Sequence, residues 1–284
     1  MVNDLNVVFL VPSRNRACQL HALMESVRIN FDNPPGFHII YSISSPEFDA
    51  GYKKLQDMNM FPSIVWHRER DLYGDFLDKI NEEDWSEFVC LCSDDSLFYR
   101  KVDLRPKDLD YIFDAETICF NFRLGLNTLV QDYLNGSRQP PLTDYTTSPD
   151  NRFIKWNYKR YSDVHNYGYP FSFDGHVYRT EDLNRYTRTL ALDAGKIRHW
   201  EGRMCGGQHR HVLDKSSMQC YQHSVLFNNP VNCVQDPPLY HSNNVHIPPE
   251  ALNTMFLEGK VIDVEKLREL DISGSHQEWG YVFK

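Results

Sequence analysis

The 284-residue chain has the composition of an ordinary folded protein, with 41% hydrophobic and 24% charged residues. Its 17 Phe, 16 Tyr and 5 Trp residues supply ample apolar surface for a core, which argues against a disordered chain. The 30 basic and 39 acidic side chains give a net charge of −9, which argues against passive electrostatic binding to nucleic acid or to an anionic membrane.

The sequence has no apolar run near the roughly 18 residues that a membrane-spanning helix needs. Asn3, Asp4 and Asn6 would interrupt the apolar core of a signal peptide. The seven cysteines include no CxxC pair, which favours free thiols in a reducing compartment over disulfides or a zinc site. These features predict a cytoplasmic protein without a membrane span.

The first hundred residues alternate strand and helix patterns. Continuous apolar runs predict buried strands over residues 6–11, 37–43, 63–66 and 87–92. Apolar residues at helical spacing predict helices over residues 20–27, 52–58 and 72–80. Pro12 is expected to end the first strand. This order predicts a parallel sheet with helices on both faces, which binds ligands at the carboxyl ends of its strands.

Polar side chains follow three of the predicted strands at the point where each strand ends. These segments are Ser13-Arg14-Asn15-Arg16, Ser44-Ser45 and Asp94-Asp95. Because the carboxyl ends of parallel strands meet at one edge of a sheet, we expect the three segments to lie on one rim.

The second half of the chain is less regular. Strands are predicted over residues 117–122 and 171–178, and a helix over residues 180–192. Residues 133–170 are rich in Tyr, Asn, Pro and Asp, which predicts an irregular insertion lined by aromatic side chains. Without an obvious linker, one domain is favoured over two.

Asp94 and Asp95 are the sharpest chemical signal. Two adjacent carboxylates at the end of a buried strand repel each other, and no cation neighbours them in the sequence. Mg²⁺ or Mn²⁺ bridging to a diphosphate would balance them, because both ions prefer oxygen ligands. The alternative is a solvated Ser-Asp-Asp turn.

Arg14 and Arg16 follow the first strand, where arginine side chains can bind phosphate beside a helix N-terminus. The alternative is a pair of solvated surface arginines. Neither GxGxxG nor GxxxxGK[ST] occurs, which argues against dinucleotide-binding and P-loop functions.

These motifs resemble the nucleotide-sugar-binding half of GT-A-type glycosyltransferases, above all glycosyltransferase family 2. Residues 12–16 resemble the family's nucleoside-binding segment, residues 72–81 resemble the helix before its metal-binding strand, and Ser93-Asp94-Asp95-Ser96 resembles its DxD motif. The resemblance implies a metal ion at Asp95. It also implies a nucleotide-binding role for the residues on the predicted rim, which are Pro12, Ser13, Arg14, Arg16, Ser45 and Asp94.

The back half resembles the same family through shorter motifs. Residues 173–179 resemble the glycine-containing strand that faces donor and acceptor. Glu201 lies where the family has an acidic pair that supplies the catalytic base, and His223 lies where it often has a histidine ligand to the metal. The resemblance implies that Glu201 or Asp174 removes a proton from the acceptor hydroxyl, and that Asp95 and His223 hold the metal.

The chain departs from the family at two places. The acidic residue that usually follows the second strand and reads the base is missing, and Glu47 or Asp49 are the candidates to replace it. Glu201 is a single carboxylate instead of a pair, so both an inverting and a retaining course stay open.

The sequence therefore predicts a single GT-A-like (Rossmann-like) α/β domain with a mostly parallel central sheet, helices on both faces and an irregular C-terminal acceptor-side region. Residues 1–115 form the nucleotide-sugar-binding half, and residues 116–284 form the acceptor-binding half with a C-terminal extension.

The predicted activity is metal-dependent transfer of a hexose or pentose, assisted by Mn²⁺ or Mg²⁺. The donor is a UDP- or GDP-sugar, and the acceptor is a glycan or another hydroxyl-bearing molecule. The charge of −9 disfavours a nucleic-acid acceptor without excluding it. The alternatives are a nucleotidyltransferase that makes sugar nucleotides, disfavoured because no glycine follows the first strand, and a non-catalytic carbohydrate-binding protein.

Overall fold

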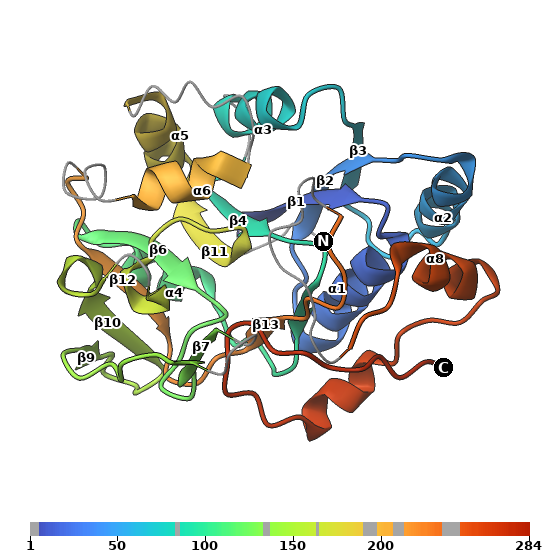
Figure 1. Cartoon of the computed structure of the whole chain (residues 1–284). Helices are drawn as coiled ribbons and strands as arrows, with labels where there is room; N and C mark the ends of the chain where they lie inside the picture. The colour runs from blue at the N-terminus through green and yellow to red at the C-terminus, as the bar shows by residue number, and fades with distance from the viewer. Residues whose placement is uncertain are drawn as a thin grey trace.

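The structure of the protein is a computed structural model, and it describes residues 6–82, 86–132, 137–162, 165–189, 198–206, 213–234 and 245–284. A nine-stranded sheet runs through the molecule in the order β3-β2-β1-β4-β11-β6-β12-β10-β9 (Figure 1). Helices cover both faces of this sheet, as the sequence predicts.

The first four strands of the sheet pair in parallel, as predicted for the first hundred residues. They are β1 (Val7–Arg14), β2 (Gly36–Ser42), β3 (Ile64–Arg68) and β4 (Phe88–Cys92). Phe9 of β1 lies opposite Phe37 of β2 and Cys90 of β4. All three side chains are fully buried, which explains the continuous apolar runs in the sequence.

Pro12 does not end the first strand, so that prediction is wrong. β1 pairs with β4 only as far as Leu10, and Pro12 lies opposite Ile40 of β2 alone. A proline has no N–H to donate, and a strand tolerates it where only one side is paired. The longer strand carries Ser13 to the edge of the sheet as a buried side chain.

The back half adds the strands β11 (Asp174–Arg179), β6 (Thr117–Asn121), β12 (Ser217–Tyr221), β10 (Phe153–Asn157) and β9 (Thr146–Thr147). β11 is antiparallel to both β4 and β6, and β10 is antiparallel to β12 and β9. β12 is parallel to β6, so the other strands of this sheet share one direction and the sheet is mostly parallel, as predicted.

The sequence patterns miss β10, which lies inside the stretch predicted to be irregular. Its Phe153, Ile154 and Trp156 side chains are buried against the sheet. Because polar and aromatic residues flank this short strand on both sides, a search for apolar runs does not detect it. The aromatic lining predicted for the insertion is also mostly core, because Tyr158 and Tyr167 are fully buried.

Two hydrophobic cores lie on opposite faces of the sheet. Side chains alternate along β1, so Phe9 and Val11 enter one core and Leu10 enters the other. The first core is covered by α1 (Ala17–Asn30), α2 (Pro46–Asp57), α4 (Pro106–Ile112) and α8 (Pro249–Leu257). The second is covered by α3 (Leu72–Asn81), α5 (Thr180–Thr189) and α6 (Arg198–Cys205).

The predicted helices are present with bounds that differ at their ends, and α1 extends beyond residues 20–27 in both directions. α2 begins at Pro46 instead of residue 52, because proline at the first helical position needs no backbone donor. α5 begins at Thr180 as predicted and is described to Thr189, and residues 190–192 lie outside the described part of the chain.

Short elements complete the fold and place part of the site. β5 (Ser96–Phe98) pairs antiparallel with β13 (Leu226–Asn228), which brings Asn228 opposite Ser96. A second hairpin joins β7 (Val130–Asp132) to β8 (Ser137–Arg138). The 3-10 helices are η1 (Tyr158–Arg160), η2 (Asn166–Gly168) and η3 (Val264–Glu269).

The C-terminal segment returns to this ladder after η3 packs near α1. The backbone N–H of Asn228 donates to the carbonyl of Ser275 at 2.9 Å, and the N–H of Gln277 donates to the carbonyl of Asn228 at 3.0 Å. Residues from the far end of the sequence therefore lie beside the end of β4.

Within the described residues, none of the helices combines the length and the apolar character needed to cross a lipid bilayer. All seven cysteines fall in the described part of the chain and are unpaired, and six of them are buried. This agrees with the prediction of free thiols.

Gly125 offers a test of the packing that holds the loop before β13. A Cβ at this position would overlap the backbone nitrogen of Ser224 and lie 2.8 Å from the carbonyl carbon of His223. We expect Gly125→Ala to lower the free energy of unfolding by about 1–3 kcal/mol or more in a denaturant titration, because backbone atoms must move.

Gly202→Ala is the matched control, because nothing lies within 4 Å of the Cβ that it adds to α6. This exposed helical position should be neutral or gain up to about 1 kcal/mol. Equal stabilities of the two variants would contradict the described packing.

Candidate active site

The three polar segments predicted to share one rim do so. Asn15, whose φ of 59° lies in the left-handed region, donates from Nδ2 to Ser44 Oγ at 2.8 Å and accepts from the Ser44 N–H at 2.9 Å. Ser13 Oγ donates to Asp94 Oδ2 at 2.8 Å. The carboxyl ends of β1, β2 and β4 therefore form one connected edge.

The predicted nucleotide-binding residues occupy different depths of this edge. Ser13, Arg16 and Asp94 are buried, whereas Arg14 is exposed at the end of β1. Pro12 is half-buried within β1. Ser45 is half-buried at the N-cap of α2, and its side chain makes no capping hydrogen bond to that helix.

Arg16 supplies the cation that the sequence does not show beside Asp94 and Asp95. Its Nη1 donates to Asp94 Oδ1 at 2.9 Å and to Asp95 Oδ2 at 3.1 Å. The premise that this acidic pair lacks a protein counter-ion is therefore wrong. The partner is a residue 78 positions away that folding brings into contact.

Burial dominates the protonation of this cluster. It raises the pKa of Asp94 to about 6, against the opposing effects of Arg16 and of the hydrogen bond from Ser13. Burial disfavours the charge on Arg16, but Asp94 and Asp95 outweigh it and raise the pKa of the guanidinium. The cluster therefore places the Arg16 guanidinium in direct contact with both carboxyl groups.

Asn228 links this cluster to a second one. Its Nδ2 lies 3.3 Å from Asp95 Oδ1 and 3.0 Å from Asp174 Oδ1. The same nitrogen lies 2.7 Å from Ser93 Oγ and 3.0 Å from Ser96 Oγ, so its two N–H bonds are shared among these acceptors.

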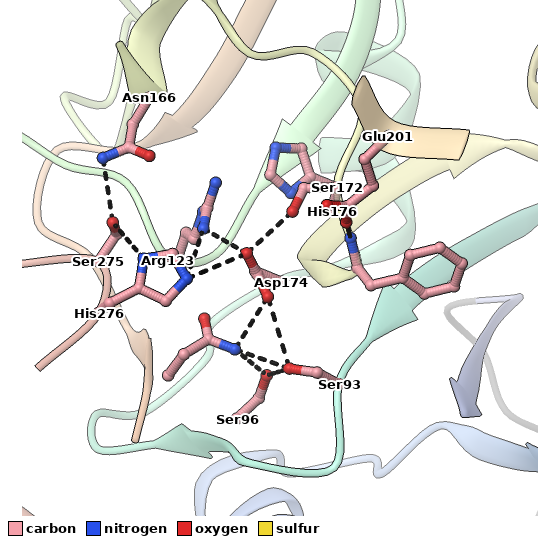
Figure 2. A network of polar contacts seen from close by, with 12 residues as sticks. Ser93, Ser96, Arg123, Asn166, Ser172, Asp174, His176, Glu201, Ser275 and His276 are labelled. Carbon is pink, nitrogen blue, oxygen red and sulfur yellow. Dashed lines mark hydrogen bonds and ion pairs between the residues drawn. The ribbon is translucent and has the colours of Figure 1, made fainter. Parts of the chain in front are cut away.

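Asp174, at the start of β11, is the centre of the second cluster (Figure 2). It forms an ion pair with the buried Arg123 and accepts from Ser172 Oγ at 2.9 Å. His276 Nε2 of the C-terminal segment lies 3.4 Å away. Although burial opposes its charge, Arg123 and then His276 hold the pKa of Asp174 well below its usual range.

Glu201 projects from α6 toward the same cluster and accepts from the backbone N–H of Phe173 (Figure 2). Its side chain is half-buried. Burial and, secondly, the negative charge of Asp174 raise the pKa of Glu201 to about 7. The two predicted catalytic carboxylates thus lie together, with their pKa values pushed in opposite directions.

The structure does not bring His223 to Asp95. The backbone carbonyl of Val225, two residues after His223, accepts from the N–H of Tyr99. Tyr99 lies four residues beyond Asp95, and four residues of extended strand span on the order of 13 Å. His223 is exposed there, and its Nδ1 lies 3.4 Å from Tyr99 Oη. The antiparallel ladder places Asn228, and not His223, beside the acidic pair.

The residues at the acidic pair do not fit a divalent cation well. Each of the four carboxylate oxygens of Asp94 and Asp95 already accepts a hydrogen bond from Ser13, Arg16, Ser93 or Asn228. In the part of the chain that the structure describes, no three His, Cys, Asp or Glu side chains gather as a metal site. The predicted ligand pair of Asp95 and His223 is therefore not assembled.

Reasoning from the sequence missed Arg123, Asn228 and His276. Arg123 follows β6 by two residues, so the rule that ligands bind at the carboxyl ends of strands could have found it. Asn228 and His276 reach the site through contacts across more than fifty positions, which no local pattern marks.

A cavity of about 450 Å³ lies at the opposite edge of the sheet. Glu87, directly before β4, and Arg179, at the end of the antiparallel β11, are among its lining residues and pair with each other at 2.8 Å. The amino ends of parallel strands are not where such sheets bind ligands, so we assign the candidate active site to the edge that holds Asp94 and Asp174.

Comparison of the sequence with models of known protein families finds no match. The chain is 21% identical over 255 residues to the bifunctional glycosyltransferase pgtA of Dictyostelium discoideum. This match covers 83% of the chain and 32% of the relative, so the chain spans about a third of the length of that protein. The chain is thus similar in sequence to a glycosyltransferase over most of its length. This bears out the predicted resemblance to glycosyltransferases, whereas the resemblance to family 2 stays a prediction.

Solved glycosyltransferases are similar to the chain at low identity. The mannosyltransferase PcManGT from Pyrobaculum calidifontis, in complex with GDP-Man and Mn²⁺, is 12% identical with a TM-score of 0.38, over 63% of this chain and 46% of that one. The galactosyltransferase LgtC, in complex with donor and acceptor sugar analogues, is 13% identical with a TM-score of 0.38, over 74% and 67% of the two chains. The site is assigned from its own geometry and not from these structures.

The opposed pKa values of the two carboxylates give a direct test of the site. We expect Glu201 to titrate near pH 7 in a carboxyl-carbon NMR titration, and Asp174→Asn to move its pKa down toward the ordinary value of 4.5, because a like charge is removed. Asp32→Asn is the control, since this exposed aspartate pairs with Lys101 elsewhere on the surface. A Glu201 pKa that stays near 7 or rises in the Asp174 variant would contradict the described pairing.

Proposed function

We propose that the chain transfers a sugar from a nucleotide-diphosphate sugar to an acceptor hydroxyl. The observation that carries the proposal is the meeting of two groups at one edge of the sheet. One is the segment from Ser13 to Arg16 with Asp94, and the other is the pair of Asp174 and Glu201, with Asn228 between them. The sequence similarity to a glycosyltransferase supports the same activity.

Glu201 is the better candidate for the catalytic base. A base works best when its pKa lies near the working pH, and the pKa of Glu201 is raised to about 7. Asp174 is paired with Arg123 and has a strongly depressed pKa, so it is a weak proton acceptor. Its proposed role is to keep Glu201 basic through its negative charge.

In the proposed step, the acceptor hydroxyl gives its proton to Glu201 as its oxygen forms a bond to the anomeric carbon of the donor sugar. The bond from that carbon to the diphosphate oxygen breaks, and the nucleoside diphosphate leaves with the electron pair. Charge grows on the diphosphate, and exposed Arg14 is the rim cation proposed to stabilise it.

The rim residues from β1 and β2 are the proposed contacts of the donor nucleotide, UDP or GDP. Ser13 is buried beside Asp94, whereas Arg14 is exposed and Ser45 is half-buried at the same edge of the sheet. The half of the chain from residue 116 onward, which supplies Asp174 and Glu201, is the proposed acceptor side.

The predicted Mn²⁺ or Mg²⁺ stays a prediction for this chain. The step above is not routed through a metal, because the oxygens of Asp94 and Asp95 are occupied by protein donors. A cytoplasmic location also stays a prediction, and the seven unpaired cysteines support a reducing compartment.

Nucleotide binding is the first test. UDP or GDP at a concentration well above its dissociation constant should raise the melting temperature by several degrees, because a ligand that binds only the folded state stabilises it. Arg14→Ala should reduce the shift, whereas Arg28→Ala, which removes an exposed arginine paired with Glu25 on α1, should not. If no nucleoside diphosphate shifts the melting temperature of the wild-type protein, the proposal is wrong.

Catalysis is the second test. With a donor identified from a screen of sugar nucleotides, Glu201→Gln should lower kcat about 10²–10⁴-fold and leave the donor KM nearly unchanged, because only proton removal is lost. The wild-type kcat should rise with pH up to about 7 and then level, since the base must be deprotonated.

Two outcomes would count against this assignment. An unchanged kcat in Glu201→Gln would exclude Glu201 as the base. Release of pyrophosphate from a nucleoside triphosphate, with no sugar transfer, would identify a nucleotidyltransferase instead.

A further inference from the structure

Arg16 is bound to the acidic pair in a way that leaves little for another cation. Its Nη1 donates to one carboxylate oxygen of Asp94 and to one of Asp95, and carboxylate oxygens are the groups that would hold a divalent cation. Ser13 occupies the other oxygen of Asp94. Ser93 Oγ donates to the other oxygen of Asp95 at 2.8 Å.

The other two nitrogens of the Arg16 guanidinium donate hydrogen bonds to Asn232. Nε donates to Asn232 Oδ1 at 2.8 Å, and Nη2 donates to the backbone carbonyl of Asn232. Gln19 Nε2 lies 3.4 Å from the same Asn232 Oδ1. Only 8% of the Arg16 side chain is exposed, so the guanidinium is held in place from both sides and is not a surface group that happens to lie near the carboxylates.

The charges at the site are nearly balanced without a metal. Two carboxylates and one guanidinium leave a net charge of −1 at the acidic pair. The neighbouring Asp174 is already neutralised by Arg123. A divalent ion would have to displace Arg16 and strand a buried cation, which is costly in a protein interior.

We propose that Arg16 takes the place of a divalent cation at this site, so that the donor diphosphate binds beside an acidic pair neutralised by the chain itself. The inference rests on the proposed function for the identity of the ligand, but the pairing of Arg16 does not. Donor binding then requires no added metal, and the aspartates act by holding Arg16 and Ser13 at the rim.

The proposal makes an opposite prediction for the protein without this side chain. Arg16→Ala leaves two buried carboxylates without a counter-ion and opens space where the guanidinium lay. Oxygen ligands around such a space suit Mn²⁺. Removal of Arg16 should therefore create the metal dependence that the wild-type protein lacks.

The experiment uses the purified 284-residue chain, dialysed against EDTA and then freed of chelator. The melting temperature is measured for wild type, Arg16→Ala and Arg28→Ala, each with and without Mn²⁺. We expect Mn²⁺ to leave wild type and Arg28→Ala unchanged. Arg16→Ala should melt several degrees lower, and Mn²⁺ should restore part of that loss. Arg28 is the matched control because it lies on the same helix as an exposed side chain.

The same samples are then titrated with UDP and GDP in EDTA. We expect the nucleotide to raise the wild-type melting temperature equally with EDTA and with Mn²⁺. A wild-type shift that appears only with Mn²⁺ would overturn the proposal, as would a stabilisation of wild type by Mn²⁺ alone that equals the effect on Arg16→Ala.

One further measurement covers the case in which the variant does not fold, and the Mn²⁺ measurements cover the case in which no nucleotide binds. If Arg16→Ala does not fold, the binding of Mn²⁺ to wild type is followed by the loss of its free-ion EPR signal, and stoichiometric binding would refute the proposal. If no nucleotide binds under any condition, the proposed function fails, while the Mn²⁺ arms still report on Arg16.

Discussion

The ion pairs of Arg16 with Asp94 and Asp95 hold the candidate site together. They tie the junction of β1 and α1 to the end of β4 and, through Asn232, to the loop after β13. Because Arg16 and Asp94 are buried, loss of one partner would leave an uncompensated charge in the protein interior. Because these ion pairs close the edge of the sheet, Ser13 is buried beside Asp94, whereas Arg14 next to it is exposed to solvent.

The second cluster uses the same forces to separate two carboxylates. Arg123 stabilises the charge on Asp174, and that charge, together with burial, destabilises the charge on Glu201. Carboxylates whose pKa values are driven apart are a common basis for acid and base roles in enzymes. The arrangement gives one side chain that stays ionised and another that exchanges a proton near neutral pH.

Much of the fold was predictable from local pattern. The apolar runs of β1, β2 and β4 mark strands buried on both faces, and the polar residues after them mark the ligand-binding edge. The strand β10 was missed because its buried residues are interspersed with Lys155 and flanked by polar turns. The extension of β1 beyond Pro12 was missed because pairing on one side alone cannot be read from the sequence.

The candidate site was predictable only in part. Asp94, Asp174 and Glu201 were predicted because each stands at a recognisable motif. The structure places them on one connected network, and their roles in the reaction stay predictions. The partners that set their charge state were not found, because Arg16 meets Asp94 across 78 positions and Asn228 meets Asp174 across 54. Charge balance is a property of the folded arrangement, so a sequence that shows two adjacent aspartates does not show whether a metal or an arginine neutralises them.

A crystal structure with a nucleoside diphosphate, grown in the absence of divalent cations, would show whether the donor binds at this edge of the sheet without a metal. We expect density for the diphosphate at the edge formed by Ser13 and Arg14, with Arg16 still bridging Asp94 and Asp95. Nucleotide bound at the opposite edge, beside Glu87 and Arg179, would contradict the assignment of the site.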